Sequence, residues 1–354
     1  MLGQDTVVSL MTGDIPALLY NEETKEFAIN PYKSSAKWSW QPGRYENQFP
    51  YTLPANKQVD FNVKVTPEDG LKGDVEVCAF LLTSTGRISV QPFIPMLSKF
   101  ISNVPLSSSL MFGTAQLPGL LAQTIYSMPS VDWTLAIREL TGAPNVISPV
   151  LFGRRFTDRQ KERLFDPRQA QLLSKFMHVY WLGPTTGVLV TAGGVVSTVQ
   201  GGAEVTLPAG GTVTLYYQVP GDAVFDCKWI LDDSTSTTGL EPNVVAQIFP
   251  GDNATPLNDV PMSWRDFLAS PTTLPIAGMP SDGFLRAASL PSPGGCWTNT
   301  FERSTKIKVV FTSTDAGTIT LRTGFHGTLI YAAEAVLSQL NSQAGAVQNQ
   351  MVTR

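Results

Sequence analysis

Residues 203–217 carry a clear strand signal. They read Ala203-Glu204-Val205-Thr206-Leu207, then a Pro-Ala-Gly-Gly turn, then Thr212-Val213-Thr214-Leu215-Tyr216-Tyr217. Apolar and polar residues alternate on both sides of a turn, which is typical of two β-strands that each bury one face. This stretch therefore predicts β-structure, and the same pattern recurs along most of the chain.

Further strands are predicted on either side of it. They lie at residues 60–65, 74–82, 87–90, 178–182, 224–231, 244–249, 306–312 and 318–331. Many short strands separated by Gly-, Pro- and Ser-rich loops favour a β-sandwich or jelly roll over a parallel α/β sheet. The expected fold class is all-β and mainly antiparallel.

A few helices are predicted in the middle of the chain. Apolar residues in 117–141 have helical spacing. A capping box formed by Thr157 and Gln160 predicts a helix over 158–165. Asp166 followed by Pro167 predicts a second helix that runs to Phe176. A short helical turn is expected at 263–269.

Charged residues are unusually scarce. Asp, Glu, Lys and Arg make up 15% of the 354 residues, against about 25% in an ordinary soluble domain. No apolar run approaches the roughly 18 residues that a membrane span requires. Because interface cores are depleted in Lys, Glu and Asp, the shortage indicates surface covered by other protein chains. The alternative is a large β-domain with an exterior rich in Ser and Thr.

The net charge, the cysteines and the first 20 residues exclude several classes of protein. A net charge of −4 excludes a strongly basic nucleic-acid binder as the reading of the whole chain. Three widely spaced cysteines without a CxxC pair indicate free thiols in a reducing compartment. The first 20 residues contain no Lys or Arg, so no secretory signal is expected and synthesis in the cytosol is predicted.

Residues for catalysis are few. The two histidines, His178 and His326, have no other candidate ligand near them in sequence, and both are interpreted as structural. The motifs of nucleotide-binding loops and hydrolase nucleophiles are missing. The sequence therefore predicts no enzyme activity, no catalytic or metal-binding residues and no cofactor. The sequence alone does not exclude a catalytic triad formed by residues that are far apart in the chain.

One basic cluster stands out. Residues 152–176 contain seven basic and three acidic residues, a net charge of +4 in an acidic chain. One interpretation is a solvated helix surface with local ion pairs. The other is weak contact with RNA or with a neighbouring subunit. The candidate residues are Arg154, Arg155, Arg159, Lys161, Arg163 and Arg168.

Four segments carry a family resemblance. A predicted helix leads into an aromatic strand at 169–183, a strand closes on Tyr217-Gln218-Val219-Pro220-Gly221, a Ser-Trp-Arg motif lies at 263–268, and residues 321–330 form a last strand. Together they resemble capsid proteins of picorna-like positive-strand RNA viruses over about the last 190 residues. Thr323 and His326 depart from the family pattern, and the 263–268 motif falls later than in that family.

The resemblance implies a viral jelly-roll coat protein. Such a structural capsid subunit assembles with copies of itself or sister capsid proteins into an icosahedral shell around an RNA genome. Its implied partners are those subunits, genomic RNA held non-specifically and a host receptor. Its implied location is the virion, assembled in the host cytoplasm. An Arg-rich N-terminal arm is missing, which argues against condensing RNA through a basic tail.

The expected organisation has four parts. Residues 1–110 form an N-terminal β-region or extended arm, either a second β-sandwich or early jelly-roll strands. Residues 111–180 form a helical connection, 181–335 the core jelly-roll strands and 336–354 a C-terminal tail. The fold is thus a viral jelly-roll β-sandwich with a few short helices and one or two β-domains.

Two other functions are alternatives to the role of a capsid subunit. One is a carbohydrate- or receptor-binding β-sandwich of the viral or phage fibre type, with Trp38, Trp40, Trp181 and Trp297 lining its site. The other is a β-sandwich hydrolase that uses the two histidines.

Overall fold

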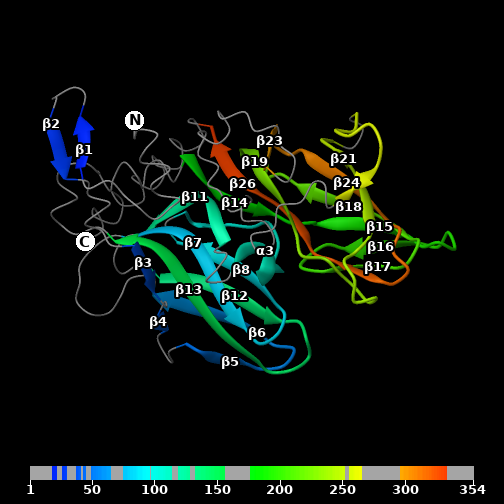
Figure 1. The fold of residues 1–354 in the computed structure, drawn as a ribbon, viewed down its shortest axis with the longest axis horizontal. Coiled ribbons are helices and arrows are strands. Elements are labelled where there is room, and N and C mark those ends of the chain that lie inside the picture. The colour runs from blue at the N-terminus through cyan, green and yellow to red at the C-terminus, as the bar shows by residue number, and fades with distance from the viewer. Residues whose placement is uncertain are drawn as a thin grey trace, which may run out of the picture.

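Nearly all of the described chain is antiparallel β-structure (Figure 1). The computed structural model describes residues 18–21, 26–29, 37–40, 43–44, 49–64, 75–95, 97–113, 119–127, 132–155, 176–251, 255–264 and 296–332. Within them the α-helix bounded by the structure is the single turn α3 (Ser108–Met111). A separate hairpin near the start pairs β1 (Leu18–Asn21) with β2 (Glu26–Ile29). The all-β, antiparallel prediction is confirmed.

Two sheets form the first half of the chain. The β13 sheet has the order β11-β7-β13-β3, with β5 also paired to β13. Its strands are β3 (Lys37–Trp40), β5 (Tyr51–Leu53), β7 (Val75–Ser84), β11 (Gly119–Ser127) and β13 (Asn145–Arg155). The β12 sheet has the order β10-β8-β12-β6-β4, with β9 paired to β8. Its strands are β4 (Gly43–Arg44), β6 (Gln58–Lys64), β8 (Ile88–Ile94), β9 (Lys99–Phe100), β10 (Leu106–Ser107) and β12 (Asp132–Glu139).

Two larger sheets and one small sheet form the second half. The β14 sheet contains, in spatial order, β14 (Met177–Leu182), β26 (Thr323–Tyr331), β19 (Ala223–Asp232) and β23 (Cys296–Phe301). The β16 sheet contains, in spatial order, β16 (Val196–Gln200), β15 (Thr186–Val190), β18 (Thr212–Gln218), β24 (Lys306–Ser313), β21 (Val244–Phe249) and β22 (Met262–Ser263). The small sheet contains β17 (Val205–Leu207), β25 (Ile319–Leu321) and β20 (Thr235–Ser236).

The strand order in both halves is that of a jelly roll. In the second half the eight main strands in chain order are β14, β18, β19, β21, β22, β23, β24 and β26. One sheet joins the first, last, third and sixth of these, and the other joins the second, seventh, fourth and fifth. The first half repeats this order, with β3 or β5 as its first strand and β13 as its last. The chain therefore carries two jelly rolls in tandem, each made of two interlocked Greek keys.

Strand β14 is buried on both faces from His178 to Leu182 and joins the two jelly rolls. Along β14, Val179 and Trp181 pack into the core of the first jelly roll, while Tyr180 and Leu182 pack into the core of the second. Side chains of a strand alternate between its two faces. A strand that lies between two hydrophobic cores therefore needs apolar residues at consecutive positions. The backbone of 101–103 in the first jelly roll runs along β14, with a hydrogen bond of 2.9 Å from Trp181 N–H to the Ile101 carbonyl.

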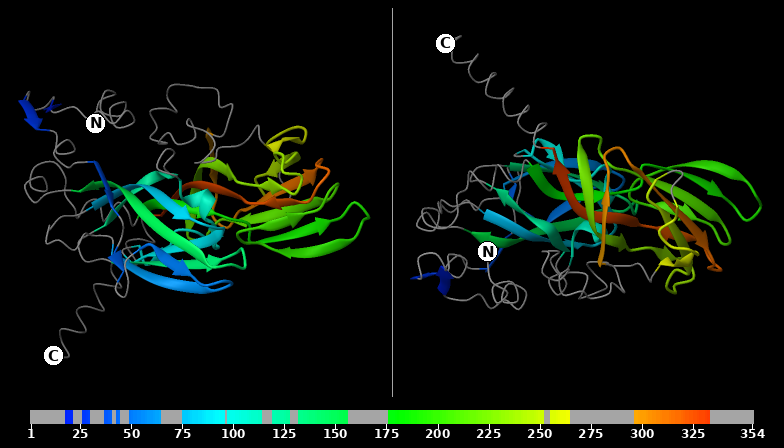
Figure 2. Two further views of the ribbon diagram at one scale, coloured as in Figure 1. Left: turned by 60° about the horizontal axis from the view of Figure 1, so that its bottom comes forward. Right: turned by 90° about the horizontal axis from the view of Figure 1, so that it is seen from above.

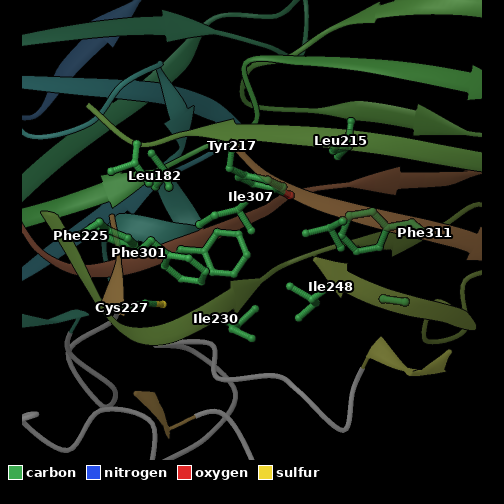
Figure 3. Packing of buried hydrophobic residues seen from close by; sticks show 14 of the residues in the cluster. Leu182, Leu215, Tyr217, Phe225, Cys227, Ile230, Ile248, Phe301, Ile307 and Phe311 are labelled. Atoms are coloured by element: carbon green, nitrogen blue, oxygen red, sulfur yellow. The ribbon is translucent and has the colours of Figure 1, made fainter. Parts of the chain in front are cut away.

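The second core lies between the β14 and β16 sheets (Figure 3). Every second residue of β18 and β24 points into it, including Leu215, Tyr217, Ile307 and Phe311. The hydroxyl groups of Tyr217 and Thr323 share a 2.6 Å hydrogen bond, so the buried Tyr217 hydroxyl has a hydrogen-bonding partner. The period-two patterns of the sequence thus become the inner faces of this sandwich.

Some helical predictions are wrong. The segment 117–141 forms β11 and β12 instead of helices. Within the predicted helical connection at 111–180, the described residues 119–127 and 132–155 are strands of the first jelly roll. Of the predicted helical turn at 263–269, Ser263 belongs to β22 and Trp264 begins a tight helical turn, while 265–269 lie outside the described residues. The predicted helix 158–165 lies outside the described residues, as does 167–176 except for Phe176.

Candidate assembly surfaces

The predicted basic cluster is placed only at its beginning. Arg154 and Arg155 are the last residues of β13, where their backbones pair with Glu76 and Val75 of β7. Arg159, Lys161, Arg163 and Arg168 lie outside the described residues. The two described arginines therefore lie at the end of a sheet.

His326 is a structural residue of the joint between the jelly rolls. Its ring is stacked between Trp181, at 4.1 Å between centroids, and Trp229, at 5.0 Å. Its Nδ1 lies 3.2 Å from the Tyr180 carbonyl, and its Nε2 accepts a 2.9 Å hydrogen bond from the Ala122 N–H. A carbonyl only accepts, which places the ring proton on Nδ1. Ala122 belongs to β11, so this ring links the first jelly roll to β14 and β26.

His178 lies on the same sheet in a different environment. It is 4% exposed and stacks on Tyr331 at 5.3 Å. Its Nε2 is buried without a hydrogen-bond partner among the described residues. Burial, followed by the charge of Lys99, lowers the pKa of His178 to about 4, and Asp222 opposes this effect. The ring is therefore neutral at physiological pH.

Ion pairs connect the two jelly rolls at two places. Glu204 of the second jelly roll accepts from Arg322 Nε at 2.9 Å and from Arg87 of the first at 2.8 Å. Lys99 of the first lies 2.5 Å from Asp222 of the second. Together with the reciprocal hydrogen bonds between Asn103 and the backbone of Gly183, at 2.7 and 2.8 Å, they fix one jelly roll against the other.

Two carboxyl groups have pKa values that their surroundings shift in opposite directions. Burial would raise the pKa of Glu139, but hydrogen bonds from the Thr141 hydroxyl and from the backbone N–H groups of Asn56, Thr141 and Gly142 lower it to about 2. In Asp232, burial raises the pKa to about 6, against hydrogen bonds from Ser234 and Trp264. Both groups accept hydrogen bonds from residues of a local turn.

The outer face of the β16 sheet has a strip without charge. On β15, β16 and β18 the side chains that point away from the core contain no Asp, Glu, Lys, Arg or His. Val188, Val190 and Val196 are exposed by 36%, 37% and 65%. We call this surface the uncharged strip; it consists of Thr186, Val188, Val190, Val196, Thr198, Gln200, Thr212, Thr214, Tyr216 and Gln218.

The matching face of the first jelly roll is different. The outward side chains of β6 and β12 include Asp60, Asp132 and Arg138. On the β16 sheet, charge appears only beyond the strip, on β24, where Lys306 lies over Tyr216 and Lys308 over Phe249. The three strands of the strip thus carry no charged side chain, whereas β24 on the same face carries two lysines.

The tryptophans suggested from the sequence for a sugar-binding site lie on three different strands. Trp181 is 1% exposed and covered by His326, so it lines no exposed sugar site. Trp38 and Trp40 lie on β3, and Trp297 lies on β23 in another sheet. The described ranges contain no group of three or more His, Cys, Asp or Glu residues placed to hold a metal ion. They also contain no helix long and apolar enough to cross a membrane.

Comparisons with known proteins give little. Neither a family model nor a curated protein sequence matches the chain. Among solved structures, a chain in the atomic structure of Sulfolobus Turreted Icosahedral Virus aligns over 90% of this chain and 97% of its own length, with 11% identity and a TM-score of 0.31. Because this superposition is loose, the fold assignment rests on the strand order of the chain itself.

Proposed function

We propose that the chain is a structural capsid subunit whose copies, alone or with sister subunits, assemble into a closed icosahedral shell. A jelly roll by itself serves many functions. The observation that carries the proposal is the uncharged strip, the part of an exposed sheet face where β15, β16 and β18 carry no charged side chain. The role is structural and includes no catalytic step.

The strip has the chemistry of a surface that becomes covered. Val and Thr side chains on a sheet face can bury apolar area in an interface without burying a charge, and an unpaired charge there would cost several kcal/mol. The core of a protein interface is depleted in charge in the same way. A sheet face that remained in water would gain solubility from Lys or Glu at these positions.

The nature of the enclosed genome rests on the sequence resemblance. Its motifs lie on β14, at the end of β18 and on β26, so the resemblance belongs to the second jelly roll. We propose RNA as the cargo and the virion as the location, with assembly in the host cytoplasm. Nucleic acid recovered from purified particles would be degraded by ribonuclease and resist deoxyribonuclease; the opposite result would replace RNA with DNA.

A single charge in the strip tests the assembly role. Thr214 lies on β18 in the middle of the strip, and Thr134 lies on the outer face of β12 in the first jelly roll. We expect wild type and Thr134→Lys to form fast-sedimenting particles. Thr214→Lys should keep the circular dichroism spectrum of wild type and sediment as a small species, because its charge would be buried unpaired.

Two results would overturn the proposal. One is a wild-type chain that stays monomeric at high concentration with and without RNA. The other is a Thr214→Lys variant that assembles as well as wild type.

A further inference from the structure

Strand β16 presents an open edge at the end of the second jelly roll that lies away from the first (Figure 2). It is the last strand of its sheet and pairs only with β15 among the described strands. The β15–β16 hairpin projects there, and Val195 and Val196 near its tip are both 65% exposed. An edge of this kind offers a row of backbone N–H and C=O groups to another strand.

The register of the hairpin identifies those groups. Thr191 N–H bonds to the Val195 carbonyl, and Gly201 N–H bonds to the Thr185 carbonyl. Hydrogen-bonded and non-hydrogen-bonded pairs alternate in an antiparallel ladder, and no register shift interrupts this one. The backbone groups of Val196, Thr198 and Gln200 therefore point to the open edge, while those of Ser197 and Val199 point to β15.

The edge lacks the protection that isolated proteins give to exposed strands. Charged side chains, proline and bulges normally prevent edge-to-edge pairing. Residues 186–200 contain no Asp, Glu, Lys, Arg or Pro, and the β15–β16 ladder contains no bulge. The same strand also belongs to the uncharged strip, so the open edge continues the surface that the proposed function covers.

We propose that β16 of one copy pairs with β16 of a second copy, antiparallel and about a two-fold axis through Thr198, so that their two β16 sheets become one continuous sheet. This rests on the proposed function and names one of its contacts. In that register Thr198 faces Thr198, and Val196 faces Gln200 of the other copy. No like charges meet, so the same five-residue edge is complementary to itself.

Cysteine cross-linking tests the register. At the axis the two Thr198 Cα atoms would be about 5.5 Å apart, within disulfide range. The two Val196 Cα atoms would be roughly 14 Å apart, beyond it. Under mild oxidation Thr198→Cys should become mostly disulfide-linked dimer, while Val196→Cys should match the background of wild type, which has its own three cysteines. Equal cross-linking of both variants would overturn the proposed register.

Proline at the same position tests the pairing itself. The Thr198 N–H points away from β15, so Thr198→Pro removes an outward donor and leaves the hairpin ladder intact. In the Thr214→Lys background, which should not form shells, dimerisation measured by sedimentation should weaken at least about tenfold, because each interface loses two donors. Thr198→Val, which keeps the backbone donor, should dimerise like wild type. A Thr198→Pro variant with wild-type melting and undiminished dimerisation would overturn the inference.

The outcomes separate this inference from the proposed function. Shells that form normally from Thr198→Pro would exclude the β16 pair and leave the capsid role standing. A Thr198→Cys dimer from a chain that never forms shells would support the β16 pair and exclude the capsid role. The charge of Thr214→Lys lies two strands from the edge. The double variant Thr214→Lys/Thr198→Cys should therefore form no shells but should still form the disulfide-linked dimer.

Discussion

His178 and His326 lie on neighbouring strands but stabilise the protein in different ways. Both nitrogens of His326 have hydrogen-bonding partners, and the ring stacks between two tryptophans. His178 stacks on Tyr331 and has a buried Nε2 without a partner among the described residues. The first therefore contributes directional bonds across the joint, and the second contributes packing that depends on its staying neutral.

Acid stability depends on His178. Its pKa is lowered from 6.5 to about 4 in the fold, so the unfolded chain binds more protons between these values. Stability from this group is complete above pH 6.5 and falls as the pH drops toward 4, by up to about 3 kcal/mol. His178→Phe keeps an aromatic ring against Tyr331 and should lose this slope. Urea unfolding from pH 4 to 7 measures it; equal slopes in both proteins would contradict the assignment.

The hydrogen bonds of His326 should have a measurable effect on stability. His326→Phe keeps a ring between Trp181 and Trp229 but removes the donor to the Tyr180 carbonyl and the acceptor for the Ala122 N–H. Unfolding free energy should fall by about 1–3 kcal/mol. Ile330→Phe on the same strand, at a position 39% exposed, serves as the control and should change little. Equal unfolding midpoints for the two variants would show that the bonds are unimportant.

At the scale of elements, the pairing of β26 with β19 leaves no room for a side chain at Gly327. A Cβ built there would lie 2.2 Å from the Asp226 carbonyl oxygen and 2.9 Å from the Cys227 Cα, both backbone atoms. This approach occurs where β19 has a register shift between Cys227 and Trp229. The glycine therefore lets the two strands pair through the irregularity.

Gly327→Ala should be strongly destabilising. Two backbones would have to separate, at a cost of about 1–3 kcal/mol or more. Gly193→Ala is the matched control, since the nearest atom to its Cβ would be Thr191 Oγ1 at 3.9 Å. Thermal unfolding should show a clearly lower melting temperature for Gly327→Ala alone. A similar melting temperature in both variants would mean that β26 and β19 are not packed this closely.

The helical prediction at 117–141 shows where sequence patterns mislead. In β12, the apolar residues Trp133, Leu135 and Ile137 lie two positions apart and all face the core. Trp133 and Ile137 are also four positions apart, which is the spacing of one face of a helix. In β11 a register shift between Leu120 and Ile125 interrupts the period of two. An irregular strand and a short helix share this spacing, and the pairing partners that decide between them are far away in sequence.

At the scale of the molecule, the tandem arrangement depends on contacts that no local pattern contains. Each jelly roll pairs its first strand with its last, as β14 with β26. Because such partners are far apart in the sequence, the sequence could not decide between one and two jelly rolls. The strands of the second jelly roll were predictable because their alternation is regular. The shortage of charge in the sequence did not say where charge is missing, and the register of β15, β16 and β18 was needed to locate the uncharged strip. The basic cluster remains a prediction, since four of its six residues lie outside the described chain.

Electron microscopy of the purified full-length chain tests the central claim most directly. A shell subunit with an uncharged sheet face should form closed particles of uniform diameter, alone or once its sister subunits are added. Monomers or isolated spikes under all these conditions, at concentrations where obligate interfaces are saturated, would contradict the account.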